Sequence, residues 1–146
     1  MTLTTFGAIM GFASEVIRQS ELTYQSMVEK AKHPALKEAL QVLLNESRKN
    51  HSLMEQSRRE HVTEMILEPI TGLDPEAYHL DLEISNSAED VHLFKTALMI
   101  EEREKRFFQD VSSRVPLPEV AKMFRKIGQK KEKNIDRLRS LRLFPF

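Results

Sequence analysis

Residues 94–115 read FKTALMIEEREKRFFQDVSSRV, and residues 120–141 read VAKMFRKIGQKKEKNIDRLRSL. In both stretches apolar side chains recur three or four residues apart, the spacing that places them on one face of an α-helix. The middle of these two apolar stripes is polar and consists of Glu101, Glu104, Lys131 and Asn134. Polar groups aimed at a core are costly unless they meet partners. These four residues are therefore predicted to meet inside the protein, with a Glu101–Lys131 ion pair.

Two further stretches with helical periodicity precede these. Together the four predict helices at roughly 5–32, 34–65, 87–114 and 118–141. Pro34 suits a first helical position, and Ser87 is expected to cap the third helix. The connection between the second and third helices, roughly 67–86, is long for neighbouring helices, whereas the other two are short. The pattern predicts one all-α domain over 1–146, a four-helix bundle of two antiparallel helical hairpins joined by a long crossover.

The two halves of the chain share a spacing of polar and aromatic positions. Residues 84 apart correspond in the pairs Tyr24–Phe108 and Ile17–Glu101, and residues 83 apart in the pairs Arg48–Lys131 and His51–Asn134. This favours a diverged tandem of one helical hairpin. The alternative is that two unrelated amphipathic hairpins align in some register.

Composition excludes several classes of protein. The 146 residues carry 22 basic and 22 acidic side chains, which argues against a general nucleic-acid binder. The lack of cysteine excludes disulfides, zinc–thiolate sites and iron–sulfur clusters. The sequence contains no run of about 18 apolar residues, so no membrane span is predicted. The N-terminus lacks the basic region of a secretory signal. A cytoplasmic location is expected.

The C-terminal end combines a basic face with an apolar tail. The basic residues are Lys130, Lys131, Lys133, Arg137, Arg139 and Arg142. They are interpreted as a solvated helix face that complements the negative end of the helix dipole. The tail, residues 143–146, could dock on a partner or on its own bundle. A homodimer or a protein partner is expected, with no nucleic acid and no membrane.

The segment from Phe12 to Leu53 resembles the first hairpin of the rubrerythrin-like branch of the ferritin-like superfamily. The resemblance rests on Tyr24 in the first helix, the EKAKHP turn at 29–34 and His51 after a charged run. The segments 97–108 and 124–138 are similar to the matching second hairpin. The rubredoxin module of full rubrerythrins is missing, and a chain without cysteine could not build it.

This resemblance implies a ferritin-like bundle that holds two iron or manganese ions. The ligands in such bundles are one Glu from each of two helices and a Glu-x-x-His from each of the others. Carried over to this chain, the positions are Ile17 on the first helix, Arg48 and His51 on the second, Glu101 with Glu104 on the third, and Lys131 and Asn134 on the fourth. One ligand position holds isoleucine and two hold cations, so the di-metal site is expected to be degenerate.

Our hypothesis is that an internal network of Glu, Lys and Arg replaces the metal centre, and that the domain has a non-catalytic interaction or structural role. Lys131 and Arg48 would balance Glu101 and Glu104, although Arg48 lies roughly 100° from the centre of its own apolar stripe. Its place inside therefore rests on the resemblance alone. His51 is either a former ligand or a satisfied polar core residue.

Two alternatives remain open at this point. One is an oxidoreductase of peroxide or iron handling that binds iron or manganese through His51, Glu101 and Glu104. With a register shift its ligand set would instead be Glu15, Glu46, Glu55, His51 and Glu101. The other alternative is an interaction module that never held a metal and turns these residues to solvent.

Overall fold

Four long helices dominate the computed structural model, which describes residues 3, 5–60 and 73–144. They are α1 (Phe6–Lys30), α2 (Pro34–Glu60), α3 (Asp90–Ser112) and α4 (Pro118–Ser140), with a short 3-10 helix η2 (Pro75–Tyr78) before α3. Between the described residues, the only β-type pairing is an isolated bridge from Leu3 to Leu73. The prediction of an all-helical chain is confirmed. The expected end of the second helix, 61–65, and the start of the crossover, 67–72, lie outside the described residues.

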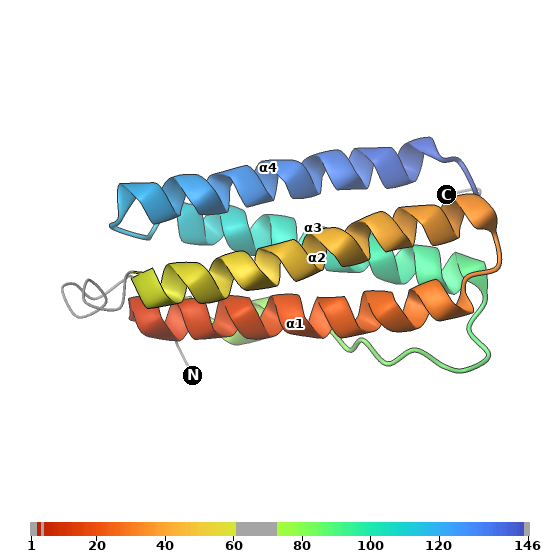
Figure 1. Ribbon diagram of the computed structural model, residues 1–146, viewed down its shortest axis with the longest axis horizontal. Helices are drawn as coiled ribbons and strands as arrows, with labels where there is room; N and C mark the ends of the chain where they lie inside the picture. Colours follow the sequence, from red (N-terminus) through yellow and green to blue (C-terminus); the bar gives the residue numbers. More distant parts are fainter. Residues whose placement is uncertain (1–2, 4, 61–72, 145–146) are drawn as a thin grey trace.

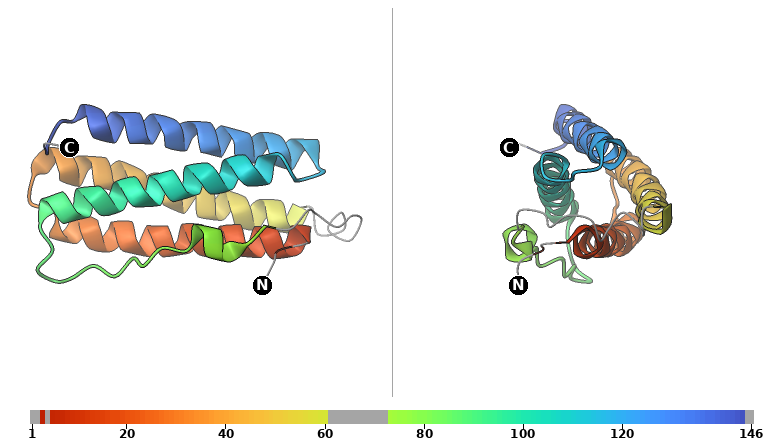
Figure 2. Two further views of the ribbon diagram at one scale, coloured as in Figure 1. Left: turned by 180° about the vertical axis from the view of Figure 1, so that it is seen from behind. Right: turned by 90° about the vertical axis from the view of Figure 1, so that its left-hand side faces the viewer.

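The helices lie side by side along the length of the molecule (Figure 1). α1 packs along α2, and α3 packs along α4. Viewed end-on, the four helices surround a common centre, with α2 beside α4 and α1 beside α3 (Figure 2). The described part of the crossover runs outside this group, close to α1 and α3.

Local sequence signals set several helix ends. The Thr5 hydroxyl caps α1 by accepting a hydrogen bond from the Ala8 amide at 3.1 Å. α1 ends before His33-Pro34, where Ala31 is extended, and Pro34 begins α2 as predicted.

The predicted Ser87 cap is wrong. α3 begins at Asp90, and its N-cap residue Glu89 makes no side-chain capping bond. The Ser87 amide donates instead to the Ser85 hydroxyl in a preceding turn. The Asp90 carboxylate accepts from the amides of Lys32 (3.0 Å) and His33 (2.8 Å), so it fixes the start of α3 to the α1–α2 connection.

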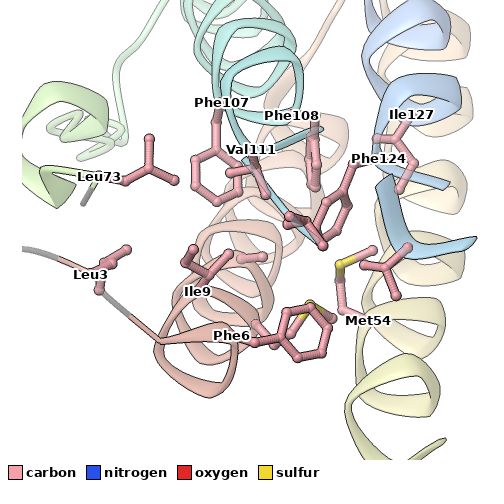
Figure 3. Close-up of a cluster of buried hydrophobic side chains, with 14 of the residues drawn as sticks. Leu3, Phe6, Ile9, Met54, Leu73, Phe107, Phe108, Val111, Phe124 and Ile127 are labelled. Atoms are coloured by element: carbon pink, nitrogen blue, oxygen red, sulfur yellow. The ribbon is translucent and has the colours of Figure 1, made fainter. Parts of the chain in front are cut away.

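Two apolar clusters make up the core. The first gathers aromatic and aliphatic side chains at one end of the bundle, among them Phe6, Phe107, Phe108 and Phe124 (Figure 3). The second occupies the other end and includes Tyr24, Leu40 and Phe94. Between the two clusters lies a layer of buried polar side chains.

The crossover and the tail both pack on the bundle. Asp74 caps η2 through the Glu76 amide, and the Tyr78 hydroxyl donates to Asp110 at 2.6 Å. In the tail, the rings of Phe144 and Phe94 lie 5.3 Å apart, so the described part of the tail docks on its own bundle. Pro145 and Phe146 lie outside the described residues.

None of the helices in the described ranges combines the length and the apolar character needed to cross a membrane.

Candidate functional site

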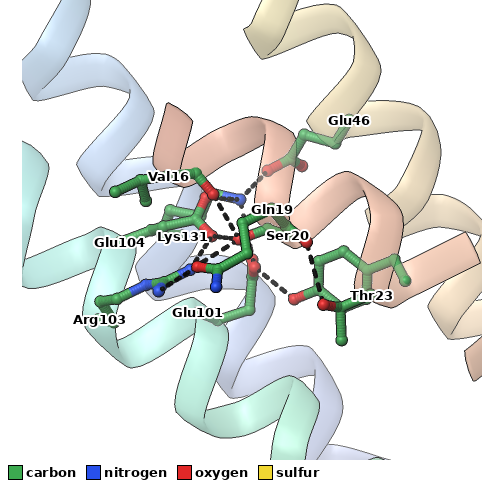
Figure 4. Close-up of polar contacts among 10 residues, drawn as sticks. Val16, Gln19, Ser20, Thr23, Glu46, Glu101, Arg103, Glu104 and Lys131 are labelled. Carbon is green, nitrogen blue, oxygen red and sulfur yellow. Dashed lines mark hydrogen bonds and ion pairs between the residues drawn. The ribbon is translucent and has the colours of Figure 1, made fainter. Parts of the chain in front are cut away.

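The four polar residues picked out by helical periodicity do meet inside the bundle. α3 contributes Glu101 and Glu104, which are one turn apart, and α4 contributes Lys131 and Asn134, which have the same spacing. All four are buried, and the Lys131 side chain is 0% exposed. The interpretation of Lys131 as part of a solvated basic face is therefore wrong. The contacts among them form the centre of a polar layer that joins all four long helices (Figure 4).

Lys131 lies among three carboxylates. Its Nζ is 3.2 Å from Glu101 Oε2, 3.3 Å from Glu104 Oε1 and 3.3 Å from Glu46 Oε1. The ammonium donates a hydrogen bond to Glu101 Oε2 and is held by the charges of the other two carboxylates. Glu46 comes from α2, and the lysine therefore ties α4 to both α2 and α3.

Glu101 is the most fully bonded carboxylate of the layer. Its Oε2 accepts from the Tyr24 hydroxyl at 2.7 Å as well as from Lys131, and its Oε1 accepts from Asn134 Nδ2 at 2.8 Å. The Asn134 amide also donates to Glu46 at 2.8 Å. Every oxygen of Glu101 thus has a donor, which is what a buried charge requires.

Glu104 connects the lysine to a second cation. Its Oε2 accepts from the Ser20 hydroxyl at 2.5 Å, while its Oε1 has no hydrogen-bond donor and is held by the charge of Lys131. Arg103 Nη2 donates to Ser20 at 2.9 Å and lies 3.8 Å from Glu104. Its Nη1 donates to Gln19, and its Nε has no partner among the described residues.

We call this set the polar layer and define it as Ser20, Tyr24, Glu46, Glu101, Arg103, Glu104, Lys131 and Asn134. With every group ionised, three carboxylates face two cations, so the layer carries one excess negative charge. Burial raises the pKa of Glu101 above its usual range. The Lys131 charge opposes that shift, and the neighbouring Glu104 charge adds to it. A raised carboxyl pKa is the direction that an excess of buried negative charge requires.

Burial and the neighbouring charges also shift the pKa of Lys131, Tyr24 and Arg103. Burial works against a charged Lys131, but the charges of Glu101, Glu104 and Glu46 outweigh it and raise the pKa of the ammonium above its ordinary value. Burial, together with the Glu101 charge, raises the pKa of Tyr24, so its hydroxyl keeps its proton as a donor. Burial lowers the pKa of Arg103, an effect that Glu104 opposes.

Three of the expected network residues lie outside the layer. Ile17 is buried in the first apolar cluster. The expectation that Arg48 balances the interior carboxylates is wrong: its side chain is 49% exposed and pairs with Glu21 at 3.6 Å. His51 is partly exposed and lies 3.5 Å from Glu21, so it belongs to the α1–α2 surface.

The structure does not bring together the five residues of the alternative ligand set with a shifted register either. Of its five members only Glu46 and Glu101 lie in the layer, while Glu15 is exposed and faces Arg18. Glu55 accepts from Ser14, and this hydrogen bond lowers its pKa. Within residues 3, 5–60 and 73–144, no group of three or more His, Asp or Glu side chains is arranged to hold a metal ion.

Sequence reasoning missed the role of Arg103. It precedes Glu104 on α3 and lies to one side of the apolar stripe, so periodicity gives no reason to place it inside. Its partner Gln19 comes from α1, 84 residues earlier in the chain. Ser20, also on α1, lies 84 residues before its partner Glu104.

Comparison with known proteins gives no further guidance on function. A scan against protein-family models and searches of curated proteins and of solved structures returned no match.

Proposed function

We propose that this protein is a ferritin-like, rubrerythrin-like bundle of two helical hairpins in which the Lys131 ammonium takes the place of a metal centre. In this proposal the domain has an interaction or structural role and no redox catalysis. One observation supports it above all: the ammonium lies 3.2–3.3 Å from the three carboxylates that would otherwise bind a cation.

The side chains do not fit the di-metal centre that the resemblance implies. Carboxylate and imidazole ligands are needed from all four helices. Here α1 offers Ile17 at the corresponding position, His51 faces the α1–α2 surface, and Lys131 stands among the carboxylates themselves. A protonated lysine has no lone pair for a metal, and the raised pKa of Lys131 keeps it protonated.

The test is metal uptake. The purified chain is incubated with iron(II) or manganese(II) under anaerobic conditions, desalted and examined by elemental analysis. We expect no stoichiometric metal, because the ammonium already occupies the position among the three carboxylates. Two tightly bound ions per chain, as in the metal-containing bundles, would overturn the proposal in favour of iron or peroxide handling.

Lys131→Glu is the matched positive variant for this test. It removes the ammonium and adds a fourth carboxylate at the same place, so it is expected to take up divalent metal under the same conditions. Lys130→Glu makes the same change of charge at the neighbouring exposed position and is expected to behave like the unchanged protein.

A further inference from the structure

A groove of about 480 Å³ lies on the surface between α2 and α4. Its apolar part is formed by the partly buried Leu53 of α2 and Met123 of α4, with the buried Ile127 of α4 beneath them. A smaller hollow of about 170 Å³ shares Leu53 and Met123 and extends the groove toward Glu60. The apolar surface is therefore continuous along the facing edges of the two helices.

The packing of the bundle explains why this groove is open. α1 packs along α2 and α3 along α4, whereas α2 and α4 come close at few positions. Their main link is polar, from Glu46 to Lys131 and Asn134 in the polar layer. Beyond that link Leu53 and Met123 stay only partly buried. The Ser57 hydroxyl, in the smaller hollow, is buried without a hydrogen-bond partner among the described residues.

The rim of the groove is basic. Its ammonium groups come from Lys49, Lys122, Lys126 and Lys130, and its carboxylates come from Glu119 and, in the smaller hollow, Glu60. The three lysines of α4 are four residues apart, so they share the helix edge that faces α2. All four lysines are exposed, and none has an ion-pair partner among the described residues. Since the whole chain has no net charge, this positive rim is a local feature.

We propose that this groove binds an acidic amphipathic helix of a partner protein, an inference that rests on the interaction role proposed above. The apolar floor suits anchors spaced three or four residues apart, and the rim suits carboxylates on either side of them. From Lys49 to Glu60 the groove follows α2 for roughly 16 Å, about three helical turns. The floor is recessed between two helices, which fits a helix better than the flat surface of a bilayer.

A synthetic peptide tests this with the full chain. The probe is an amphipathic peptide of about 16 residues, with leucines at helical spacing and glutamates elsewhere. Its control has the same composition in scrambled order. By fluorescence anisotropy we expect the amphipathic peptide to bind at least about tenfold more tightly than the scrambled one. Equal affinity for the two peptides would overturn the proposal.

Two double variants locate the binding. Lys122→Glu with Lys126→Glu reverses the rim and is expected to weaken peptide binding by about tenfold or more. Lys37→Glu with Arg125→Glu makes the same change of net charge at exposed positions outside the groove and is expected to change affinity by less than about twofold. All four side chains are exposed, so circular dichroism should show both variants folded. If both variants lost peptide affinity equally, the effect would come from net charge alone, and the proposal that the peptide binds in the groove would be wrong.

The lack of cysteine allows a direct readout of the site. Met123→Cys carries the only thiol of its chain, and an environment-sensitive dye attached there is expected to shift to the blue when the peptide binds. The same dye on Gln129→Cys, at an exposed position of α4 outside the groove, should not shift. A shift at both positions, or at neither, contradicts binding in the groove.

An anionic membrane is the alternative ligand for a basic rim, and vesicles rich in phosphatidylserine test whether the chain binds one. If the chain binds them through Lys122 and Lys126 and ignores the peptide, the groove serves a membrane and the proposal is wrong. Metal analysis separates this failure from failure of the proposed function. If the chain takes up no metal and does not bind the peptide, only the proposal of a peptide-binding groove is wrong. If the chain takes up metal and binds the peptide, only the proposal of a metal-free role is wrong.

Discussion

Lys131 is the residue on which the interior depends, because its ammonium is the nearest positive charge to three carboxylates. A buried ion pair adds little net stability compared with apolar packing, but removal of one partner leaves the other charged and unpaired. Glu101 and Glu104 are fully buried, so water cannot replace the lysine. The polar layer therefore tolerates the loss of its cation poorly.

Lys131→Met is expected to destabilise the protein by roughly 3–5 kcal/mol, because it strands buried carboxylates while keeping the length of the side chain. The measurement is chemical denaturation followed by circular dichroism. Lys133→Met makes the same substitution at an exposed position of α4 and is expected to stay within about 0.5 kcal/mol of the unchanged protein. A small loss for Lys131→Met, similar to that of the control, would contradict a buried charge network.

The stability supplied by Lys131 should also depend on pH at the alkaline end. Its pKa is higher in the folded protein than the ordinary value of 10.5, so the native state keeps the proton to higher pH than the unfolded chain does. The stabilisation is then fully present below about pH 10.5 and is lost as the pH rises above it. We expect the difference in unfolding free energy between the protein and Lys131→Met to be flat up to about pH 10 and to shrink beyond.

Denaturation curves at a series of pH values measure this difference, with Lys133→Met as the control for ordinary lysine titration. If the difference in unfolding free energy already shrank between neutral pH and pH 9, Lys131 would lose its proton early, which would contradict a raised pKa for this lysine.

At this scale helical periodicity predicted the interior better than the family resemblance did. The positions of Glu101, Glu104, Lys131 and Asn134 followed from their place in apolar stripes. Arg48 was placed inside only by analogy with a ligand position, although its helical angle already pointed away from the core. Arg103 could not be predicted, because its partners Gln19 and Ser20 come from α1 and depend on how the hairpins pack.

At the scale of the elements, local signals fixed some helix ends and failed where tertiary contacts competed. Pro34 began α2 as expected, because proline needs no amide partner at a first helical position. The capping pattern at Ser87 did not hold, since the Asp90 carboxylate is bound to the amides of Lys32 and His33 from the α1–α2 connection. Such a contact between distant segments leaves no mark in the local sequence.

The C-terminal tail is an element whose role can be tested by truncation. Because Phe144 packs on Phe94, ending the chain after Leu141 should lower stability by about 1 kcal/mol or more. The mass in solution, measured by sedimentation, should not change, because the described part of the tail contacts its own bundle. A truncated chain that dissociates from an oligomer to a monomer would show that the tail builds an interface instead.

At the scale of the whole molecule, the all-helical class and the four long helices followed from periodicity. The predicted tandem of two hairpins pairs positions 84 apart on the first and third helices. Ser20 and Glu104 are 84 residues apart and bonded to each other, as are Gln19 and Arg103. Two contacts thus repeat the spacing between corresponding positions of the two halves, which favours the tandem origin. The open groove between α2 and α4 had no sequence signal, because it depends on the distance between two helices.

The most direct test of the account is the protonation state of Lys131 itself. The ammonium groups of lysines in ¹⁵N-labelled protein are observed by ¹H–¹⁵N correlation spectroscopy at neutral and alkaline pH. We predict one ammonium signal that is protected from exchange with water, retains the nitrogen shift of the charged form up to at least about pH 10.5, and is absent from Lys131→Met. A protected signal with the shift of a neutral amine, or no protected lysine signal at all, would contradict the claim that a lysine supplies the cation at the centre of this bundle.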